Sequence, residues 1–88
     1  MNPVIDKIGS KRWYNAAGEF HRLHGPAVEC ANGNKYWLNG KRHREDGPAI
    51  ELADGNKYWY LYGEEQTITH EDPRWEILIS KMRKLNKA

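Results

Sequence analysis

The chain has 88 residues, a net charge of +2 and a single cysteine, and 30% of its residues are charged. This length predicts one domain, residues 1–88, with a small core that needs no disulfide or structural metal. Because Cys30 is alone, an intramolecular disulfide is excluded, and we expect a small buried hydrophobic residue there. The longest apolar stretch, residues 58–62, is too short for a membrane span, and residues 1–10 lack a secretory signal pattern. We therefore expect a soluble, cytoplasmic protein.

The charges are unevenly distributed along the chain. Residues 1–23 and 24–45 each have a net charge of +2, residues 46–66 have −4, and residues 67–88 have +2. This pattern fits a basic surface for nucleic acid or an acidic protein, and it equally fits ordinary solvated faces.

A weak repeat begins at Gly9 and becomes strong after His24. The segment His24–Trp37 recurs 22 residues later as Asp46–Trp59, and ten of the fourteen positions are identical. The pattern decays toward residue 66, where Gln66 replaces the expected histidine. A fixed period indicates stacked supersecondary units, and decay at one end is typical of a terminal unit. We predict repeats over residues 9–66, used about two and a half times.

Each strong repeat contains a hairpin signal. Asn32-Gly33 and Asp54-Gly55 favour two-residue type I′ turns, because Asn, Asp and Gly tolerate positive φ. Such turns would place Val28 opposite Trp37. The predicted core face contains Val28, Cys30, Trp37, Ile50, Leu52 and Trp59. The opposite face contains Glu29, Tyr36, Glu51 and Tyr58. We expect an antiparallel meander of five or six strands.

The period changes near the C-terminus, where residues 72–86 predict a helix. Asp72-Pro73 provides an N-cap acceptor followed by a proline suited to the first helical position. One apolar stripe follows at helical spacing, formed by Trp75, Leu78, Ile79, Met82 and Leu85. The predicted fold class is therefore α+β, mostly β, with one amphipathic C-terminal helix packed on the sheet.

No catalytic or cofactor motif is present in the chain. There is no phosphate-binding loop, nucleophile elbow, HExxH or CxxC. Four residues could offer metal ligands, namely His21, His24, His43 and Asp46. Residues that recur with a repeat usually serve its fold, and the same applies to the paired Glu29 and Glu51. Cys30 falls on the predicted core face, where a thiol is inert. We expect neither an enzyme nor a cofactor or metal.

Basic and aromatic residues alternate along the repeats, as they do in proteins that bind single-stranded RNA. The candidate nucleic-acid contacts are Lys11, Arg12, Arg22, Lys35, Lys41 and Lys57. The alternative is that the aromatics fill a thin core and that the lysines protect edge strands from aggregation.

The unit GNKYWLNGKRHREDGPAIE, residues 33–51, resembles HREDGPA-type hairpin repeats in small proteins of tailed phages and large DNA viruses. More distantly it resembles MORN-variant repeats, which include an antitoxin family. The resemblance spans residues 9–63 and implies a β-hairpin array that acts as an interaction surface. In a phage setting, it implies binding and blocking of a host factor in the bacterial cytoplasm. It implies no catalytic residue, and the helix from Pro73 lies outside the repeat, so we expect no membrane partner.

The leading hypothesis is a non-enzymatic inhibitor of a host protein, such as a toxin-like nuclease or another defence component. Trp, Tyr and Arg are the residue types that dominate interface energies. The candidate partner contacts are Arg42, His43, Arg44, Tyr36, Tyr58, Lys81, Arg83 and Lys84. The first alternative is RNA binding, alone or in a ribonucleoprotein with the host target. The second is a structural homo-oligomer formed through exposed sheet edges.

Overall fold

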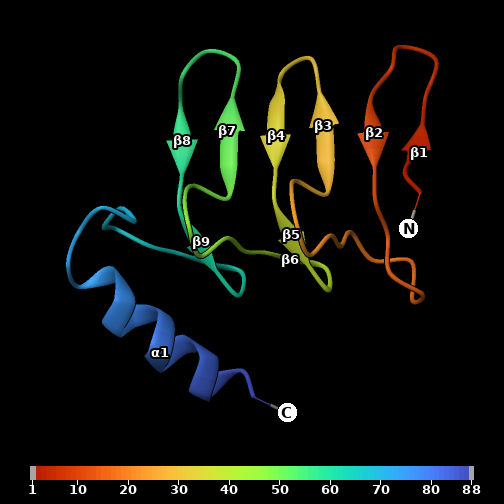
Figure 1. The fold of residues 1–88 in the computed structure, drawn as a ribbon. Coiled ribbons are helices and arrows are strands. Elements are labelled where there is room, and N and C mark those ends of the chain that lie inside the picture. The colour runs from red at the N-terminus through yellow and green to blue at the C-terminus, as the bar shows by residue number, and fades with distance from the viewer. Residues whose placement is uncertain (1, 88) are drawn as a thin grey trace.

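A computed structural model describes residues 2–87 as three long β-hairpins side by side, with a helix at one end (Figure 1). The six-stranded antiparallel sheet has the order β1-β2-β3-β4-β7-β8. Its strands are β1 (Val4–Ile5), β2 (Lys11–Arg12), β3 (Val28–Cys30), β4 (Gly33–Lys35), β7 (Ile50–Leu52) and β8 (Lys57–Tyr58). Two short hairpins pair β5 (Trp37–Leu38) with β6 (Lys41–Arg42) and β9 (Tyr60–Leu61) with β10 (Glu64–Glu65). With helix α1 (Trp75–Leu85), this confirms the predicted α+β, mostly β fold class.

The structural repeat is a long hairpin followed by a short one, and it occurs three times. The first unit starts with β1 at Val4, upstream of the predicted start at Gly9, and its short hairpin is a single bridge between Tyr14 and Phe20. Its long hairpin turns without the Asn-Gly signal, because the Asp6 carboxylate accepts hydrogen bonds from the N–H groups of Ile8 and Ser10. Asp6 acts here together with Gly9, which has φ of 87° in the same turn.

The predicted hairpin registers are wrong by two residues in the second unit and by one in the third. Cys30 pairs with Gly33, so the turn is Ala31-Asn32, whereas Ile50 pairs with Tyr58 across a longer loop. The reason lies at Gly33, which β7 approaches so closely that a Cβ atom would lie 2.3 Å from the Glu51 carbonyl oxygen. Gly33 is therefore a strand residue. As a result, the two identical GNKYW segments pair with the preceding strand in registers that differ by one residue.

The two-residue turns with positive φ at both central positions lie instead in the short hairpins. Asn39 and Gly40 have φ values of 48° and 80°, and Tyr62 and Gly63 have 51° and 86°. Positive φ at both central residues is what a type I′ turn requires.

The predicted core face is only partly correct. Val28 and Ile50 are buried, each 7% exposed, but Cys30 and Leu52 are half-buried near the hairpin loops. Cys30 is therefore not a core residue, and its thiol donates to the Asn32 side-chain oxygen at 2.6 Å. Trp37 belongs to the short hairpin of β5, so it does not face Val28.

Helix α1 starts at Trp75, three residues after the predicted start. Asp72 accepts a hydrogen bond from the backbone N–H of Arg74 and from its guanidinium group, so it stabilises a turn that precedes the helix. The Arg74 guanidinium also lowers the pKa of Asp72 to about 2. Leu85 is 69% exposed, so it does not belong to the buried stripe.

The helix packs on the last short hairpin rather than across the six-stranded sheet (Figure 1). The helix and this hairpin together form a buried hydrophobic cluster, composed of Leu61, Trp75, Ile79 and Met82. The Trp75 indole N–H also donates to the Glu45 carbonyl oxygen at 2.7 Å. Among residues 2–87, no helix has both the length and the apolar character needed to cross a bilayer.

Candidate functional site

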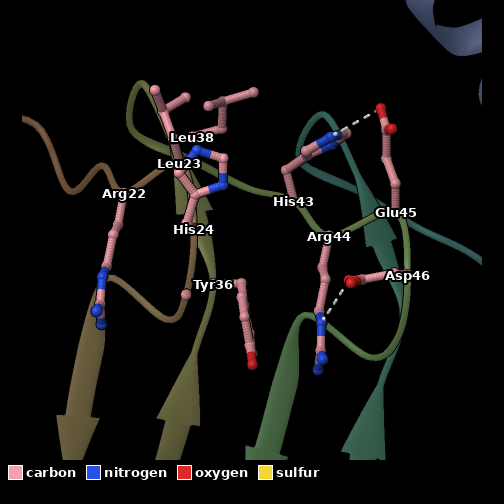
Figure 2. A pocket seen from close by; sticks show the side chains of 10 residues that line it. Arg22, Leu23, His24, Tyr36, Leu38, His43, Arg44, Glu45 and Asp46 are labelled. Carbon is pink, nitrogen blue, oxygen red and sulfur yellow. Dashed lines mark hydrogen bonds and ion pairs between the residues drawn. The ribbon is translucent and has the colours of Figure 1, made fainter.

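A pocket of about 640 Å³ lies between two connecting segments, residues 21–27 and 43–49, each of which links a short hairpin to the next long one (Figure 2). Its lining comes from both segments and from the chain around β5, and comprises Arg22, Leu23, His24, Gly25, Tyr36, Leu38, His43, Arg44, Glu45 and Asp46. The pocket is therefore a product of the repeat, because it forms where consecutive units meet.

Each connecting segment places an arginine over an aromatic ring. The Cζ atom of Arg22 lies 3.8 Å from the centroid of the Trp13 ring, and that of Arg44 lies 4.0 Å from the Tyr36 ring. These are cation–π distances. Arg44 also forms an ion pair with Glu51 at 3.1 Å. Both arginines are thus fixed in place by the fold that they help to build.

The glycine and proline of each connecting segment hold these arginines. The guanidinium of Arg44 donates to the Pro48 carbonyl oxygen at 3.2 Å, as Arg22 does to Pro26 at 3.1 Å. A Cβ atom at Gly47 would lie 2.8 Å from Cζ of Arg44. Glycine therefore leaves the space that the guanidinium occupies, which explains why the R-x-x-G-P-A pattern recurs.

The recurring histidines His21 and His43 connect neighbouring units. Nδ1 of His21 accepts from the Asn39 N–H, and Nδ1 of His43 accepts from the Tyr62 N–H, both at 2.9 Å. Burial lowers the pKa of His43, and the nearby Glu45 carboxylate offsets this only in part. His43 therefore favours the neutral form, which keeps Nδ1 available as an acceptor. Within residues 2–87 no group of three potential metal ligands is found.

Glu45 joins the pocket to the C-terminal helix. Its carboxylate forms an ion pair with the guanidinium of Arg83 on α1 and lies 3.3 Å from Nε2 of His43. The bond from Arg83 lowers the pKa of Glu45. A helix distant in sequence thus stabilises one wall of the pocket.

The structure brings some of the predicted partner contacts together and separates the others. Tyr36, His43 and Arg44 line the pocket, and Arg83 reaches its edge through Glu45. The remaining four lie elsewhere: Arg42 on β6, Tyr58 on β8, and Lys81 and Lys84 exposed on α1.

Arg42 is held between two aromatic rings outside the pocket. Its Cζ atom lies 5.4 Å from the Trp37 ring centroid and 5.3 Å from the Tyr60 ring centroid. Its guanidinium makes a long hydrogen bond, 3.4 Å, to the Tyr60 hydroxyl. Arg42 therefore bridges the second and third short hairpins.

Six pocket residues were not among the predicted contacts, namely Leu23, His24, Gly25, Leu38, Glu45 and Asp46. The sequence contained a signal for four of them. The two connecting segments read R-L-H-G-P-A and R-E-D-G-P-A, so they differ where Leu23 and His24 correspond to Glu45 and Asp46. Positions that depart from a structural repeat are free of its constraints, and here they line the pocket.

The predicted nucleic-acid contacts do not form one surface. Arg12 forms an ion pair with Asp6 at 3.1 Å, and Arg22 is 3.5 Å from Glu29. Residues directly opposite in the ladders share a face, because cross-strand partners point the same way. One face therefore contains Lys11, Glu29, Asn34, Glu51 and Lys57, and the other contains Arg12, Val28, Lys35, Ile50 and Tyr58. Lys41 lies apart, on β6.

Chemically, the pocket offers stacked planar groups, two exposed or half-buried leucines and a rim of carboxylates. Such a surface suits binding, because the guanidinium groups and rings are held rigidly before a partner arrives. Comparison of the chain with protein-family models, with curated proteins and with solved structures found no match.

Proposed function

We propose that the protein is a non-enzymatic binding protein that docks the pocket and its rim onto a protein target. In the phage setting that the repeat resemblance implies, the target is a host factor, most concretely a toxin-like nuclease or another defence component. The observation that supports this proposal is the preformed surface of Tyr36 and Arg44 beside Arg22. Tyrosine, tryptophan and arginine in a rigid setting are the residues that dominate protein interfaces.

Charge pairing favours a protein target over RNA. Five of the six arginines form ion pairs with carboxylates within the chain, namely Arg12, Arg22, Arg44, Arg74 and Arg83. RNA binding depends on cations that can neutralise phosphates, and its affinity falls steeply with salt. Neutralised arginines contribute little to such a term, and the predicted lysine contacts are divided between the two faces of the sheet and β6, so RNA is the weaker alternative.

The test is affinity purification of the tagged protein from bacterial lysate, with and without RNase, followed by mass spectrometry. The proposal expects one stoichiometric protein that survives RNase and is lost from a Tyr36→Leu bait. Tyr58→Leu is the matched control, because Tyr58 lies on β8 and does not line the pocket. A partner that disappears with RNase, or that the Tyr36→Leu bait retains, would overturn the proposal. A bait that elutes as a multimer would favour the homo-oligomer.

A further inference from the structure

We propose that the slot, the space between the Arg22 guanidinium and the Tyr36 ring, binds one planar aromatic side chain of the protein target. This inference rests on the proposed function, because it names the group through which the target would be recognised. The ligand class is a tryptophan, tyrosine or phenylalanine side chain on the surface of the target.

The argument begins with the order of planar groups across the two units. Arg22 covers Trp13 with one face, and Arg44 covers Tyr36 with one face. Figure 2 shows Tyr36 beside Arg44, with Arg22 on the opposite side of the ring. Both Arg22 and Tyr36 line the pocket, so each still has a side turned toward open space. An inserted ring would complete a continuous stack from Trp13 to Arg44.

The energetic gain comes from two contacts made at once. A ring in the slot would meet the guanidinium of Arg22 as a cation–π partner and the ring of Tyr36 as an aromatic partner. Neither group needs to be ordered on binding, because a hydrogen bond to Pro26 and an ion pair with Glu29 already fix Arg22, and Arg44 supports Tyr36. Preorganisation of this kind lowers the entropic cost of association.

The pocket also has an apolar end, which lies on the far side of His24 from the Arg22 guanidinium and the Tyr36 ring (Figure 2). Leu23 is 71% exposed and Leu38 is half-buried, and Figure 2 shows both at the same end of the pocket beside His24. A large exposed leucine next to a pocket gains from being covered, since burial removes its apolar surface from water. This apolar end favours a target whose surface around the inserted ring is itself apolar.

The rim disfavours a nucleotide as the occupant. Glu45 and Asp46 line the same pocket, and the Asp46 side chain is 87% exposed. A phosphate group tethered to a base in the slot would find the arginines at this rim already paired, because Arg44 pairs with Asp46 and Arg83 pairs with Glu45. An aromatic side chain of a protein needs no such cation, which is why the observations favour a protein aromatic over a nucleobase.

Arg22 makes fewer side-chain hydrogen bonds than its counterpart Arg44, so it keeps a donor for a ligand. Nε of Arg44 donates to Asp46 at 2.9 Å. His24 replaces that aspartate in the first connecting segment, and no hydrogen bond joins it to Arg22 among residues 2–87. The Arg22 Nε–H is thus left for the main chain of a target that inserts a ring beside it.

The experiment is an NMR titration of the isolated full-length protein with N-acetyl-tryptophan amide. N-acetyl-leucine amide is the aliphatic control and adenosine monophosphate tests a nucleobase. We expect saturable shifts for Tyr36, Arg22 and Leu23 with the tryptophan probe only, with a dissociation constant on the order of millimolar for a fragment of this size. No saturable shift, equal shifts with the leucine probe, or tighter binding of the nucleotide would each overturn the proposal.

Two variants locate the binding in the slot. Tyr36→Leu removes the stacking ring, and we expect about fivefold weaker binding of the tryptophan probe, equivalent to one lost aromatic contact. Because Tyr36 also supports Arg44, Leu23→Ala provides a second test at an exposed position, with about threefold weaker binding expected from the lost apolar contact at the end of the pocket. Unchanged affinity in both variants would contradict the proposal.

The titration uses no host protein, so it separates this inference from the proposed function. Failure to capture a target in lysate, with normal binding of the tryptophan probe, would count against the target and leave the slot intact. Capture of a target that the Tyr36→Leu bait loses, without binding of the probe, would overturn the slot alone.

Discussion

At the residue scale, Gly33 is the position where the sheet is least tolerant of a side chain. It lies in β4 with φ of 143°, and a Cβ atom would be 2.8 Å from Cα of Leu52 in addition to its contact with the Glu51 carbonyl. We expect Gly33→Ala to destabilise the protein by about 3 kcal/mol, because β4 and β7 would have to separate. Urea unfolding measures this loss.

Gly55 is the matched control, since it occupies the corresponding place in the repeated sequence. Its φ is 96°, but an added Cβ atom would meet nothing within 4 Å. Gly55→Ala should therefore cost only the backbone penalty, about 1 kcal/mol. If the two variants lose the same stability, the close approach of β7 to Gly33 is not what limits that position.

His43 makes the stability of the protein depend on pH. Its folded-state pKa lies below the ordinary 6.5 because of burial, so the unfolded chain takes up a proton first as the pH falls. The contribution of neutral His43 to the free energy of unfolding is thus complete above about pH 6.5, and it is lost as the pH falls toward the folded-state pKa. Protonation also removes Nδ1 as the acceptor for the Tyr62 N–H.

We expect the melting temperature to fall between about pH 7.5 and about pH 5.5, and to fall less in His43→Gln. Glutamine is the appropriate replacement because Gln66 occupies the same place in the third unit. The backbone N–H of Gln66 donates to the Trp59 carbonyl oxygen, just as the backbone N–H of His43 donates to the Tyr36 carbonyl oxygen. Calorimetry at several pH values measures the difference. Parallel pH profiles for the two proteins would exclude His43 as the titrating group.

At the scale of elements, α1 contributes stability through one face only. Ile79 is 5% exposed and packs in the cluster around Leu61, whereas Ile77, two residues earlier, is 70% exposed. We expect Ile79→Ala to cost about 3 kcal/mol, and Ile77→Ala to change stability by no more than about 0.5 kcal/mol. Chemical denaturation of the two variants measures both. A large loss at Ile77 would mean that this face packs on something in solution.

At the scale of the whole molecule, the fold is thin and its stability should vary across the sheet. The principal dimensions are 41 × 33 × 17 Å. Val4 in β1 is 55% exposed, while Val28 and Ile50, which occupy the same register in β3 and β7, are each 7% exposed. The first hairpin therefore buries little apolar surface at its outer strand.

We expect amide hydrogen exchange to be fastest in β1 and β2 and slowest in β3, β4 and β7, because segments with few buried contacts open first. Exchange followed by NMR or mass spectrometry measures the order. Equal protection of β1 and β4 would show either that the array unfolds as one unit or that a partner copy covers the β1 edge.

Local sequence signals were enough to predict the repeat, the presence of hairpins and a C-terminal helix. These features depend on neighbours in the chain: Gly and Asn at turns, alternation in strands, and the stripe of Trp75, Ile79 and Met82 in α1. The register was not predictable in this way. It depends on how closely β7 approaches Gly33, and that contact joins residues about 20 positions apart.

The candidate site shows the same division. The sequence alone determined which residue types recur, including the arginine of each connecting segment. Only the tertiary structure decided that Glu29 and Glu51 neutralise Arg22 and Arg44, and that Leu23 and Tyr36 line one pocket. The physical reason is that a sheet ladder sets the spacing between units, so the residues that meet at their junction follow from strand pairing and not from their spacing in the chain.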